Sequence, residues 1–297
     1  MASFHPDLRL ARFLPRSPVG PRILPLVRMA SGLVPEDRDV EVAEVEPGVS
    51  VRVHRPPSAG RSPAPGVLYV HGGGYVIGSA SMGDDFCSRL ARHLDVVVAA
   101  VEYRLAPEHP YPVPLEDCHA ALGWLAEQPD VDADRIALVG ESAGAGLAAG
   151  LSLLARERGP VVPVLQVLSY PMLDDRTTHG GVEAAAMRLW NERSNRFGWD
   201  AYLGDLRGGD VPATAAPARA GDLSGLPATW IGVGTNDLFH AEDVAWAQRL
   251  RDAGVEVGLH VVEGAYHGFD IAEPRTAVAR DFLRERIRAL QGALADG

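Results

Sequence analysis

Lysine is absent from this 297-residue chain, and its 28 basic residues are all arginine. The protein therefore has no side-chain amine for Schiff-base chemistry, no lysine general base and no Walker-type phosphate loop. The net charge is −11, and no strongly basic stretch is interleaved with aromatic residues. We therefore expect no nucleic-acid partner.

Cysteine and aromatic residues are also scarce. The only two cysteines, Cys87 and Cys118, lack C-x-x-C spacing and lie in stretches that read as helices. We expect reduced, structural thiols rather than a disulfide, and no structural zinc site. Aromatic residues make up 6% of the chain and hydrophobic residues 46%, so we expect one large α/β core built mainly from Val, Leu, Ala and Ile.

Long apolar runs are missing as well. No stretch approaches the length of a membrane span, and the N-terminal residues lack the apolar segment of a signal peptide. Five arginines before Glu36 resemble a transit peptide in composition, but five prolines between Pro6 and Pro25 interrupt any long amphipathic helix. We interpret this segment as a covering arm and expect a cytoplasmic protein.

From about residue 40, apolar strand-like runs alternate with helical stretches. Val49–His54 reads as an antiparallel edge strand, and further strands are expected over 66–71, 96–101, 136–139, 164–169, 229–234 and 255–262. Helices are expected near 83–93, 115–128, 145–158, 242–252 and 275–290. The alternation predicts a mostly parallel sheet with helices on both faces, whose ligands bind beyond the carboxyl ends of the strands.

Residues 174–226 interrupt this alternation. They contain two helix-like pieces, Val182–Trp190 and Asn195–Leu203, and a loop rich in Gly, Ala and Pro. An insertion on the ligand side of the sheet is most simply a cap over the pocket, and an ordinary surface excursion is the alternative. We therefore divide the chain into an N-terminal cap arm (1–45) and a catalytic domain (46–297) that carries the cap insertion.

The motif Gly140-Glu-Ser142-Ala-Gly144 follows a buried strand-like run and opens a helix. A serine between two glycines at a strand-to-helix turn is typical of a nucleophile elbow. The sharp turn lifts the hydroxyl above the sheet, and side chains at the two glycine positions would collide. The pattern also arises by chance in glycine-rich chains, so the interpretation depends on companion residues.

A second glycine motif, His71-Gly72-Gly73-Gly74-Tyr75, follows the strand that ends at Val70. Backbone N–H groups in such a loop can approach an anionic oxygen closely. With the N–H of Ala143, those of Gly72 and Gly73 would form an oxyanion hole. A flexible loop and a phosphate cradle are the alternatives, and the missing Gly-Lys-Ser/Thr sequence excludes a Walker-type cradle.

Two further side chains complete a triad with Ser142. Asp237 follows one expected strand, and His267 follows the next and precedes a glycine. Glu242 and Asp243 are rival acids, but they lie within the next helix. We predict Ser142 as the nucleophile, His267 as its general base and Asp237 as the acid that orients the imidazole.

These motifs, together with Tyr103-Arg-Leu-Ala-Pro-Glu-His-Pro-Tyr-Pro-Val-Pro-Leu-Glu-Asp-Cys118, resemble those of the hormone-sensitive-lipase-like α/β-hydrolases, the bacterial family IV esterases. The resemblance extends from about residue 45 to the end. It implies the α/β-hydrolase fold, with a mostly parallel, eight-stranded twisted sheet, helices on both faces and a small helical cap. The order Ser142, Asp237, His267 is the one expected there.

The chain departs from the family pattern at three places. Glu141 stands before the serine where the family usually has Asp, Ala145 replaces a usual glycine, and Leu238-Phe-His-Ala-Glu242 replaces Pro-Leu-Arg-Asp-Glu. No triad residue is lost. We also predict Tyr75 and Glu141 as substrate-binding residues.

The resemblance implies a serine carboxylesterase that hydrolyses short- to medium-chain esters through an acyl-enzyme. Such an enzyme acts on small-molecule esters as a monomer or homodimer, and it requires no metal or organic cofactor. The alternatives are a hydrolase of another acyl substrate (amide, lactone, acetylated sugar or natural product) and a non-catalytic ligand-binding receptor on the same scaffold. Such receptors tend to lose a triad residue.

Overall fold

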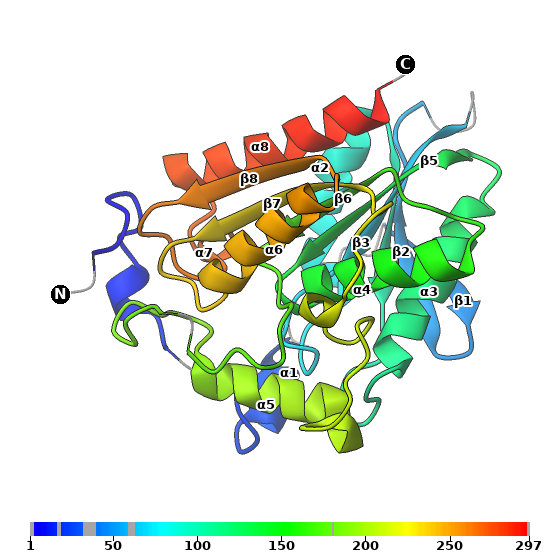
Figure 1. Ribbon diagram of the computed structural model, residues 1–297. Helices are drawn as coiled ribbons and strands as arrows, with labels where there is room; N and C mark the ends of the chain where they lie inside the picture. Colours follow the sequence, from blue (N-terminus) through cyan, green and yellow to red (C-terminus); the bar gives the residue numbers. More distant parts are fainter. Residues whose placement is uncertain (1–2, 17–18, 32–39, 59–62, 180, 296–297) are drawn as a thin grey trace.

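An eight-stranded sheet forms the centre of the computed structural model, which describes residues 3–16, 19–31, 40–58, 63–179 and 181–295 (Figure 1). The strand order is β1-β2-β4-β3-β5-β6-β7-β8. The β1–β2 and β2–β4 pairs are antiparallel and the remaining pairs are parallel. The strands are β1 (Glu41–Glu46), β2 (Val49–His54), β3 (Ala64–Val70), β4 (Val97–Glu102), β5 (Val131–Glu141), β6 (Leu165–Ser169), β7 (Ala228–Gly234) and β8 (Val257–Val262).

Helices cover both faces of the sheet (Figure 1). One face packs against α3 (Val113–Ala126), α4 (Ala143–Arg158) and α6 (His240–Asp252), and the other against α2 (Asp84–Leu94) and α8 (Ala277–Leu294). The remaining helical elements are η1 (Ala11–Phe13), α1 (Leu24–Ser31), η2 (Ala80–Gly83), α5 (Glu192–Leu203), η3 (Gly204–Leu206), η4 (Pro217–Arg219) and α7 (Phe269–Ala272).

The two hydrophobic cores follow from strand periodicity. In β3, Leu68 and Val70 belong to the core under α3 and α4, whereas Val67 and Tyr69 belong to the core under α2 and α8. A strand buried on both faces needs apolar residues at every position, which is why the central strands read as continuous apolar runs. The sequence-based prediction of a mostly parallel, eight-stranded α/β sheet is confirmed.

The two cysteines lie in opposite cores. Cys87 is on α2 and Cys118 is on α3, and both are buried and free of disulfide bonds. Burial raises the pKa of both thiols. This agrees with the prediction of reduced, structural cysteines.

The edge of the sheet differs from the prediction. β2 is antiparallel as expected, but it is not the edge strand, because β1 pairs with its outer side. β1 has the sequence Glu-Val-Ala-Glu-Val-Glu, and only Ala43 and Val45 pack partly against the core, so its apolar pattern is weaker than that of the other strands. It begins at Glu41, within the range 1–45 that we assigned to the arm.

The predicted helix over Val182–Trp190 is also wrong, because this segment forms turns. The guanidinium of Arg188 binds the carbonyl oxygens of Ala185 and Met187, and Leu189 has a positive φ of 63°. These local bonds compete with a helical hydrogen-bond ladder. The next helix, α5, begins three residues before the predicted Asn195, since the Asn191 side chain accepts from the N–H groups of Arg193 and Ser194.

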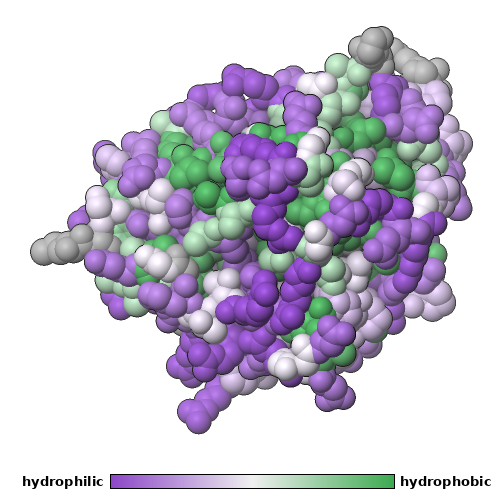
Figure 2. Space-filling view, viewed as in Figure 1, coloured by the Kyte–Doolittle hydropathy of each residue, from purple (hydrophilic) through white to green (hydrophobic). Residues whose placement is uncertain are grey.

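On the face that carries α6, hydrophilic side chains separate the apolar patches (Figure 2). Within the described ranges, no helix is long and apolar enough to cross a bilayer.

Candidate active site

Ser142 occupies a strained turn between β5 and α4. Its φ and ψ are 55° and −121°, a region that non-glycine residues rarely adopt. A Cβ atom on Gly140 would lie 2.5 Å from the Gly144 oxygen, and one on Gly144 would lie 2.2 Å from the Val70 oxygen. Both positions therefore require glycine, for the steric reason inferred from the sequence.

The three predicted triad residues lie together. Ser142 Oγ is 2.9 Å from His267 Nε2, and His267 Nδ1 is 2.8 Å from Asp237 Oδ2. An ionised carboxylate can only accept, so Nδ1 carries the proton and Nε2 is free to accept the serine hydroxyl. The side chains converge from the ends of β5, β7 and β8 because parallel strands present their carboxyl ends at one edge.

Asp237 is the acid that contacts the imidazole. It is fully buried, and its Oδ1 accepts from the N–H of Phe239 at 3.0 Å. The rival acids lie on α6 and neither is bonded to His267. Glu242 accepts from the N–H of Leu173, and burial raises its pKa to about 8. The carboxylate of Asp243 has no hydrogen-bond partner among the described residues, and burial raises its pKa well above the usual range.

Aromatic side chains hold the imidazole of His267 in place. The ring of Tyr170 meets it edge-on with centroids 4.8 Å apart, and Phe239 does so at 5.3 Å. Trp190 lies 6.3 Å away at a tilt of 36°. These contacts restrict rotation of the ring, so the imidazole stays aligned between the serine and the aspartate.

The glycine loop lies directly against the nucleophile. A Cβ atom on Gly72 would be 2.9 Å from the Glu141 oxygen and 3.4 Å from Ser142 Cβ. The backbone N–H groups of Gly72, Gly73 and Ala143 donate to no other residue in the part of the chain that the structure describes. Three unpaired donors beside a serine hydroxyl can together bind a developing oxyanion.

His71 supports this loop rather than the chemistry. Its Nδ1 donates to the Gly72 oxygen at 2.7 Å, and its ring stacks on Tyr103 with centroids 4.2 Å apart. Burial lowers the pKa of His71 to about 4. The imidazole therefore stays neutral at physiological pH and adds no charge to the site.

Ser142 and His267 open into a cavity of about 530 Å³. Much of its wall is apolar and includes Met82, Phe86, Leu189, Trp190, Ile271 and Leu283. Five charged residues also line it: Asp85, Arg89, Glu141, Asp270 and Arg286. The cavity therefore suits a small, mainly apolar ligand.

Tyr75 does not fit its predicted role as a substrate-binding residue. It is fully buried and is not among the residues that line this cavity. Its ring stacks on Tyr202 with centroids 4.0 Å apart, and its hydroxyl donates to the Met172 oxygen at 3.3 Å. Tyr75 therefore packs in the hydrophobic core rather than against the ligand.

Glu141 does line the cavity, but its carboxylate is already engaged. It belongs to a set of side chains that we name the elbow cluster: Tyr69, Glu141, Tyr170, Asp270 and Arg286. Arg286 Nη2 donates to Glu141 Oε1 at 2.8 Å, and the Tyr69 hydroxyl donates to Glu141 Oε2 at 3.0 Å. Sequence motifs did not identify Asp270 and Arg286, because nothing local distinguishes them from the other charged residues near the end of the chain.

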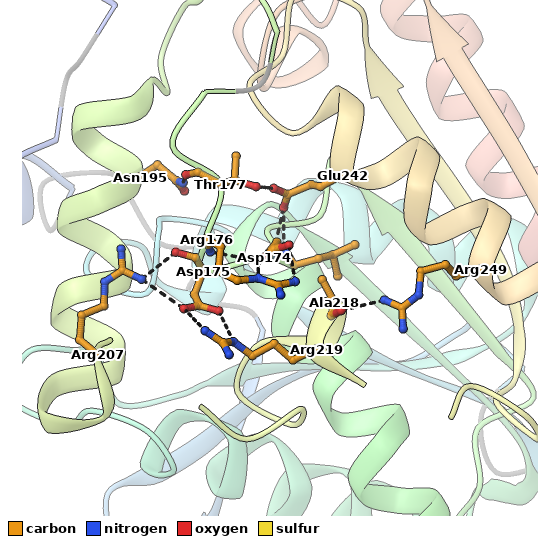
Figure 3. Close-up of polar contacts among 11 residues, drawn as sticks. Asp174, Asp175, Arg176, Thr177, Asn195, Arg207, Ala218, Arg219, Glu242 and Arg249 are labelled. Carbon is orange, nitrogen blue, oxygen red and sulfur yellow. Dashed lines mark hydrogen bonds and ion pairs between the residues drawn. The ribbon is translucent and has the colours of Figure 1, made fainter. Parts of the chain in front are cut away.

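The inserted segment is fastened by a second polar group, the insert cluster, formed by Asp174, Asp175, Arg207, Arg219 and Glu242 (Figure 3). The Asp175 carboxylate accepts from Arg219 at 2.6 Å and from Arg207 at 3.2 Å. Glu242 accepts from the N–H of Leu173 at 2.8 Å and of Asp174 at 3.2 Å. The cluster thus ties residues 173–219 to α6.

The N-terminal arm packs against the same segment. The N–H of Leu189 donates to the Pro15 oxygen at 2.9 Å, and the Ser194 hydroxyl donates to the Val19 oxygen at 2.9 Å. Val19, Leu189 and Trp190 all line the cavity. The arm and the insertion therefore meet at the cavity wall.

Among the described residues, no group of three or more His, Cys, Asp or Glu side chains is arranged to hold a metal ion.

Known proteins share both the sequence and the fold. Residues 67–271 match the model of a family described as having an alpha/beta hydrolase fold. The esterase LipI of Mycobacterium tuberculosis is 35% identical over 265 residues, which cover 87% of this chain and 78% of LipI. An ethyl acetate hydrolase of Pseudomonas putida is 36% identical over 74% of this chain and 70% of its own length. The solved structure of a bacterial heroin esterase has a TM-score of 0.87 at 36% identity, covering 99% of this chain and 98% of that one. The chain belongs to the α/β-hydrolase family, in its hormone-sensitive-lipase-like group.

Proposed function

We propose that this protein is a serine carboxylesterase that hydrolyses short- to medium-chain carboxylic esters. One observation carries the proposal. Ser142 Oγ, His267 and Asp237 form a continuous hydrogen-bonded chain beside three backbone N–H groups that have no partner among the described residues. The names of the related proteins, an esterase and an ethyl acetate hydrolase, support the same class of substrate.

In the first half of the reaction, Ser142 Oγ attacks the ester carbonyl while neutral His267 takes its proton at Nε2. Asp237 keeps the proton on Nδ1 and stabilises the imidazolium that forms. The N–H groups of Gly72, Gly73 and Ala143 bind the tetrahedral oxyanion, and each such donor contributes roughly 3–4 kcal/mol. The tetrahedral intermediate then collapses, His267 gives its proton to the departing alcohol, and an acyl-enzyme remains.

In the second half, water takes the place of the alcohol. His267 removes a proton from the water, whose oxygen attacks the acyl carbon. Collapse of the second tetrahedral intermediate returns the proton to Ser142 and releases the carboxylic acid. The atoms balance as one ester and one water converted to one acid and one alcohol.

The size of the substrate is set by the walls of the cavity. Val19 of the arm and Leu189 and Trp190 of the inserted segment close a space of about 530 Å³. The arm and the segment 174–226 thus act as the cap that limits acyl length and access. An acyl chain of many more carbons than the cavity accommodates would have to displace this packing.

Hydrolysis of 4-nitrophenyl esters from acetyl to palmitoyl tests the proposal, with Ser142→Ala as the matched variant. We expect turnover to be greatest at about two to eight acyl carbons, as the family resemblance implies, and to fall for palmitoyl, whose long chain would have to displace the packing around the cavity. Removal of the nucleophile should lower kcat by about 10⁴-fold or more. Equal turnover across the whole series would contradict the proposed size limit.

A fluorophosphonate probe distinguishes the alternatives. It should label Ser142 in the wild-type protein and leave Ser142→Ala unlabelled. Labelling without ester turnover would indicate another acyl substrate, such as an amide or lactone. A protein that neither reacts with the probe nor turns over any ester would instead be a binding protein.

A further inference from the structure

Arg286 reaches from α8 to the edge of the sheet where the triad lies. Its side chain is only 3% exposed. Nη2 donates to Glu141 Oε1 at 2.8 Å, and Nη1 donates to Asp270 Oδ2 at 3.4 Å. The guanidinium also lies over the ring of Phe86, 4.3 Å from its centroid. One cation therefore binds two carboxylates that belong to different parts of the chain.

Each of these carboxylates is close in sequence to a triad residue. Glu141 directly precedes Ser142, and Asp270 follows His267 by three residues. The distance between Ser142 Oγ and His267 Nε2, 2.9 Å, depends on how these two segments sit relative to each other. Arg286, on α8, binds both segments: one guanidinium nitrogen binds Glu141, next to Ser142, and the other binds Asp270, near His267. It therefore constrains the positions of both reacting side chains.

The connection continues to the imidazole itself. The Tyr170 hydroxyl donates to Asp270 Oδ1 at 2.9 Å, and the Tyr170 ring contacts the ring of His267 with centroids 4.8 Å apart. Tyr170 has a positive φ of 39°, so its backbone is strained and its side chain depends on such contacts for its position. A shift of Asp270 would be passed through Tyr170 to His267.

The charges in the elbow cluster explain why an arginine is required at position 286 to neutralise two buried carboxylates. Two carboxylates share one guanidinium, and both tyrosines stay neutral because burial raises their pKa values well above the ordinary one. Burial also raises the pKa of Asp270 to about 6. Without Arg286, two acidic groups would face each other in a buried site. The planar fork of arginine offers separate N–H groups to both, which the single ammonium of lysine cannot reproduce.

We infer, resting on the proposed esterase function, that Arg286 is a positioning residue that holds Ser142 against His267 through Glu141 and Asp270. It touches neither the reacting atoms nor the oxyanion loop. Although Arg286 also lines the cavity, its guanidinium is bound to Glu141 and Asp270, so we expect its loss to lower the rate of acyl transfer more than the affinity for the ester.

The test compares Arg286→Met with Arg288→Met. Arg288 lies on the same helix, its side chain is 73% exposed, and among the described residues it pairs with Glu285 alone, so it is a matched control. With 4-nitrophenyl butyrate, Arg286→Met should lower kcat about 10- to 100-fold with KM changed less than about threefold, because small misplacements of reacting groups are costly. The rate of fluorophosphonate labelling should fall in parallel. Arg288→Met should match the wild type, and Arg286→Lys should recover only part of the loss.

A triple variant separates positioning from charge balance. In Glu141→Gln, Asp270→Asn, Arg286→Met, the acids become neutral isosteres, so removal of the cation leaves no unpaired charge. We expect the melting temperature to return toward that of the wild type while kcat stays low. If kcat recovers together with stability, or if Arg286→Met alone keeps wild-type kcat, the inference is wrong.

Failure of the proposed function gives a different result. A wild-type protein that neither hydrolyses the ester nor reacts with fluorophosphonate would overturn the esterase proposal and this inference with it. If the wild type labels but does not hydrolyse 4-nitrophenyl butyrate, the labelling rates of the same variants give the answer.

Discussion

The elbow cluster and the insert cluster both bury acidic groups beyond the carboxyl ends of the strands, but they neutralise them differently. In the elbow cluster, the single guanidinium of Arg286 serves both Glu141 and Asp270. In the insert cluster, the carboxylate of Asp175 accepts from two guanidiniums, those of Arg207 and Arg219. Among the described residues, Glu242 accepts from N–H and O–H groups and from no guanidinium. Burial of an acid therefore says little about its role until its partners are known.

The two clusters also join different segments of the chain, and we expect their disruption to have different consequences for that reason. The elbow cluster connects the chain around Ser142 with the chain around His267, so a disturbance there changes the geometry of the reacting groups. The insert cluster connects residues 173–219 with α6, so a disturbance there loosens the cover of the site (Figure 3). We expect changes in the first cluster to act on activity and changes in the second to act mainly on stability.

The largest effect on kcat is expected from a comparison of two fully buried acids that lie six residues apart, Asp237 and Asp243. Asp237→Asn should lower kcat by about 10⁴-fold, because the amide cannot hold the required imidazole tautomer. Asp243→Asn should keep kcat within about threefold of the wild type, since the Asp243 carboxylate makes no hydrogen bond to a described triad residue and its raised pKa favours the neutral form. Steady-state kinetics on both variants checks this. Equal losses of kcat in the two variants would show that the hydrogen-bond partners of a buried acid do not determine its role.

Asp175→Ala should cost stability rather than activity. Its side chain is 2% exposed, and its removal leaves Arg207 and Arg219 without their shared partner. We expect the free energy of unfolding to fall by about 2–4 kcal/mol, as when one member of a buried ion pair is removed. The folded enzyme should keep kcat within about threefold. Urea unfolding and kinetics on the same preparation measure both quantities.

Asp222→Ala is the control for that change. Asp222 lies in the same inserted segment, but its side chain is 73% exposed and 4.0 Å from Arg156. Exposed pairs of this kind contribute less than about 1 kcal/mol. A loss of kcat in Asp175→Ala as large as that expected for Arg286→Met would break the comparison between the clusters.

Glu242→Gln should change how stability depends on pH. Burial raises the pKa of Glu242 to about 8, so the folded state holds this proton more tightly than the unfolded state does. The stabilisation from the bound proton is full below the ordinary glutamate pKa and is lost as pH rises through about 8. Relative to the wild type, Glu242→Gln should therefore gain stability between pH 5.5 and pH 9, by up to roughly 3 kcal/mol. Urea unfolding at both pH values tests this, and parallel curves for the two proteins would contradict it.

The smallest effect is expected at the mouth of the cavity. Arg89 and Asp85 form an i,i+4 ion pair on α2 with side chains 49% and 80% exposed. Arg89→Met should change the free energy of unfolding by less than about 0.5 kcal/mol, because solvent screens such pairs. Thermal unfolding in low and high salt checks it. A fall of 2 kcal/mol or more in the free energy of unfolding would mean that this exposed ion pair contributes as much to stability as the buried clusters do.

The sequence was most informative where local geometry restricts the choice of residue. Only glycine fits at positions 140 and 144, because a Cβ there would meet backbone atoms within 2.5 Å, and the motif around Ser142 could therefore be read directly. Strands buried on both faces also show themselves as apolar runs. β1 was missed because a largely exposed edge strand buries few apolar side chains. The segment 182–190 was misassigned because it forms turns in which the Arg188 side chain binds nearby carbonyl oxygens.

The sequence by itself determined the family and the sheet, and it predicted Ser142, Asp237 and His267 as a triad, since sharp turns and buried strands leave few residue types possible. Only the tertiary structure decided that Tyr75 faces the core and that Glu141 is held by an arginine 145 residues away. It also decided that Asp175 joins distant parts of the inserted segment to each other and that Glu242 fastens the start of this segment to α6 (Figure 3). The physical reason is that the sequence around a charged residue does not indicate which residue it will bind in the folded protein. Its role depends on which opposite charge or donor the fold brings within hydrogen-bond distance, and that pairing leaves no local pattern.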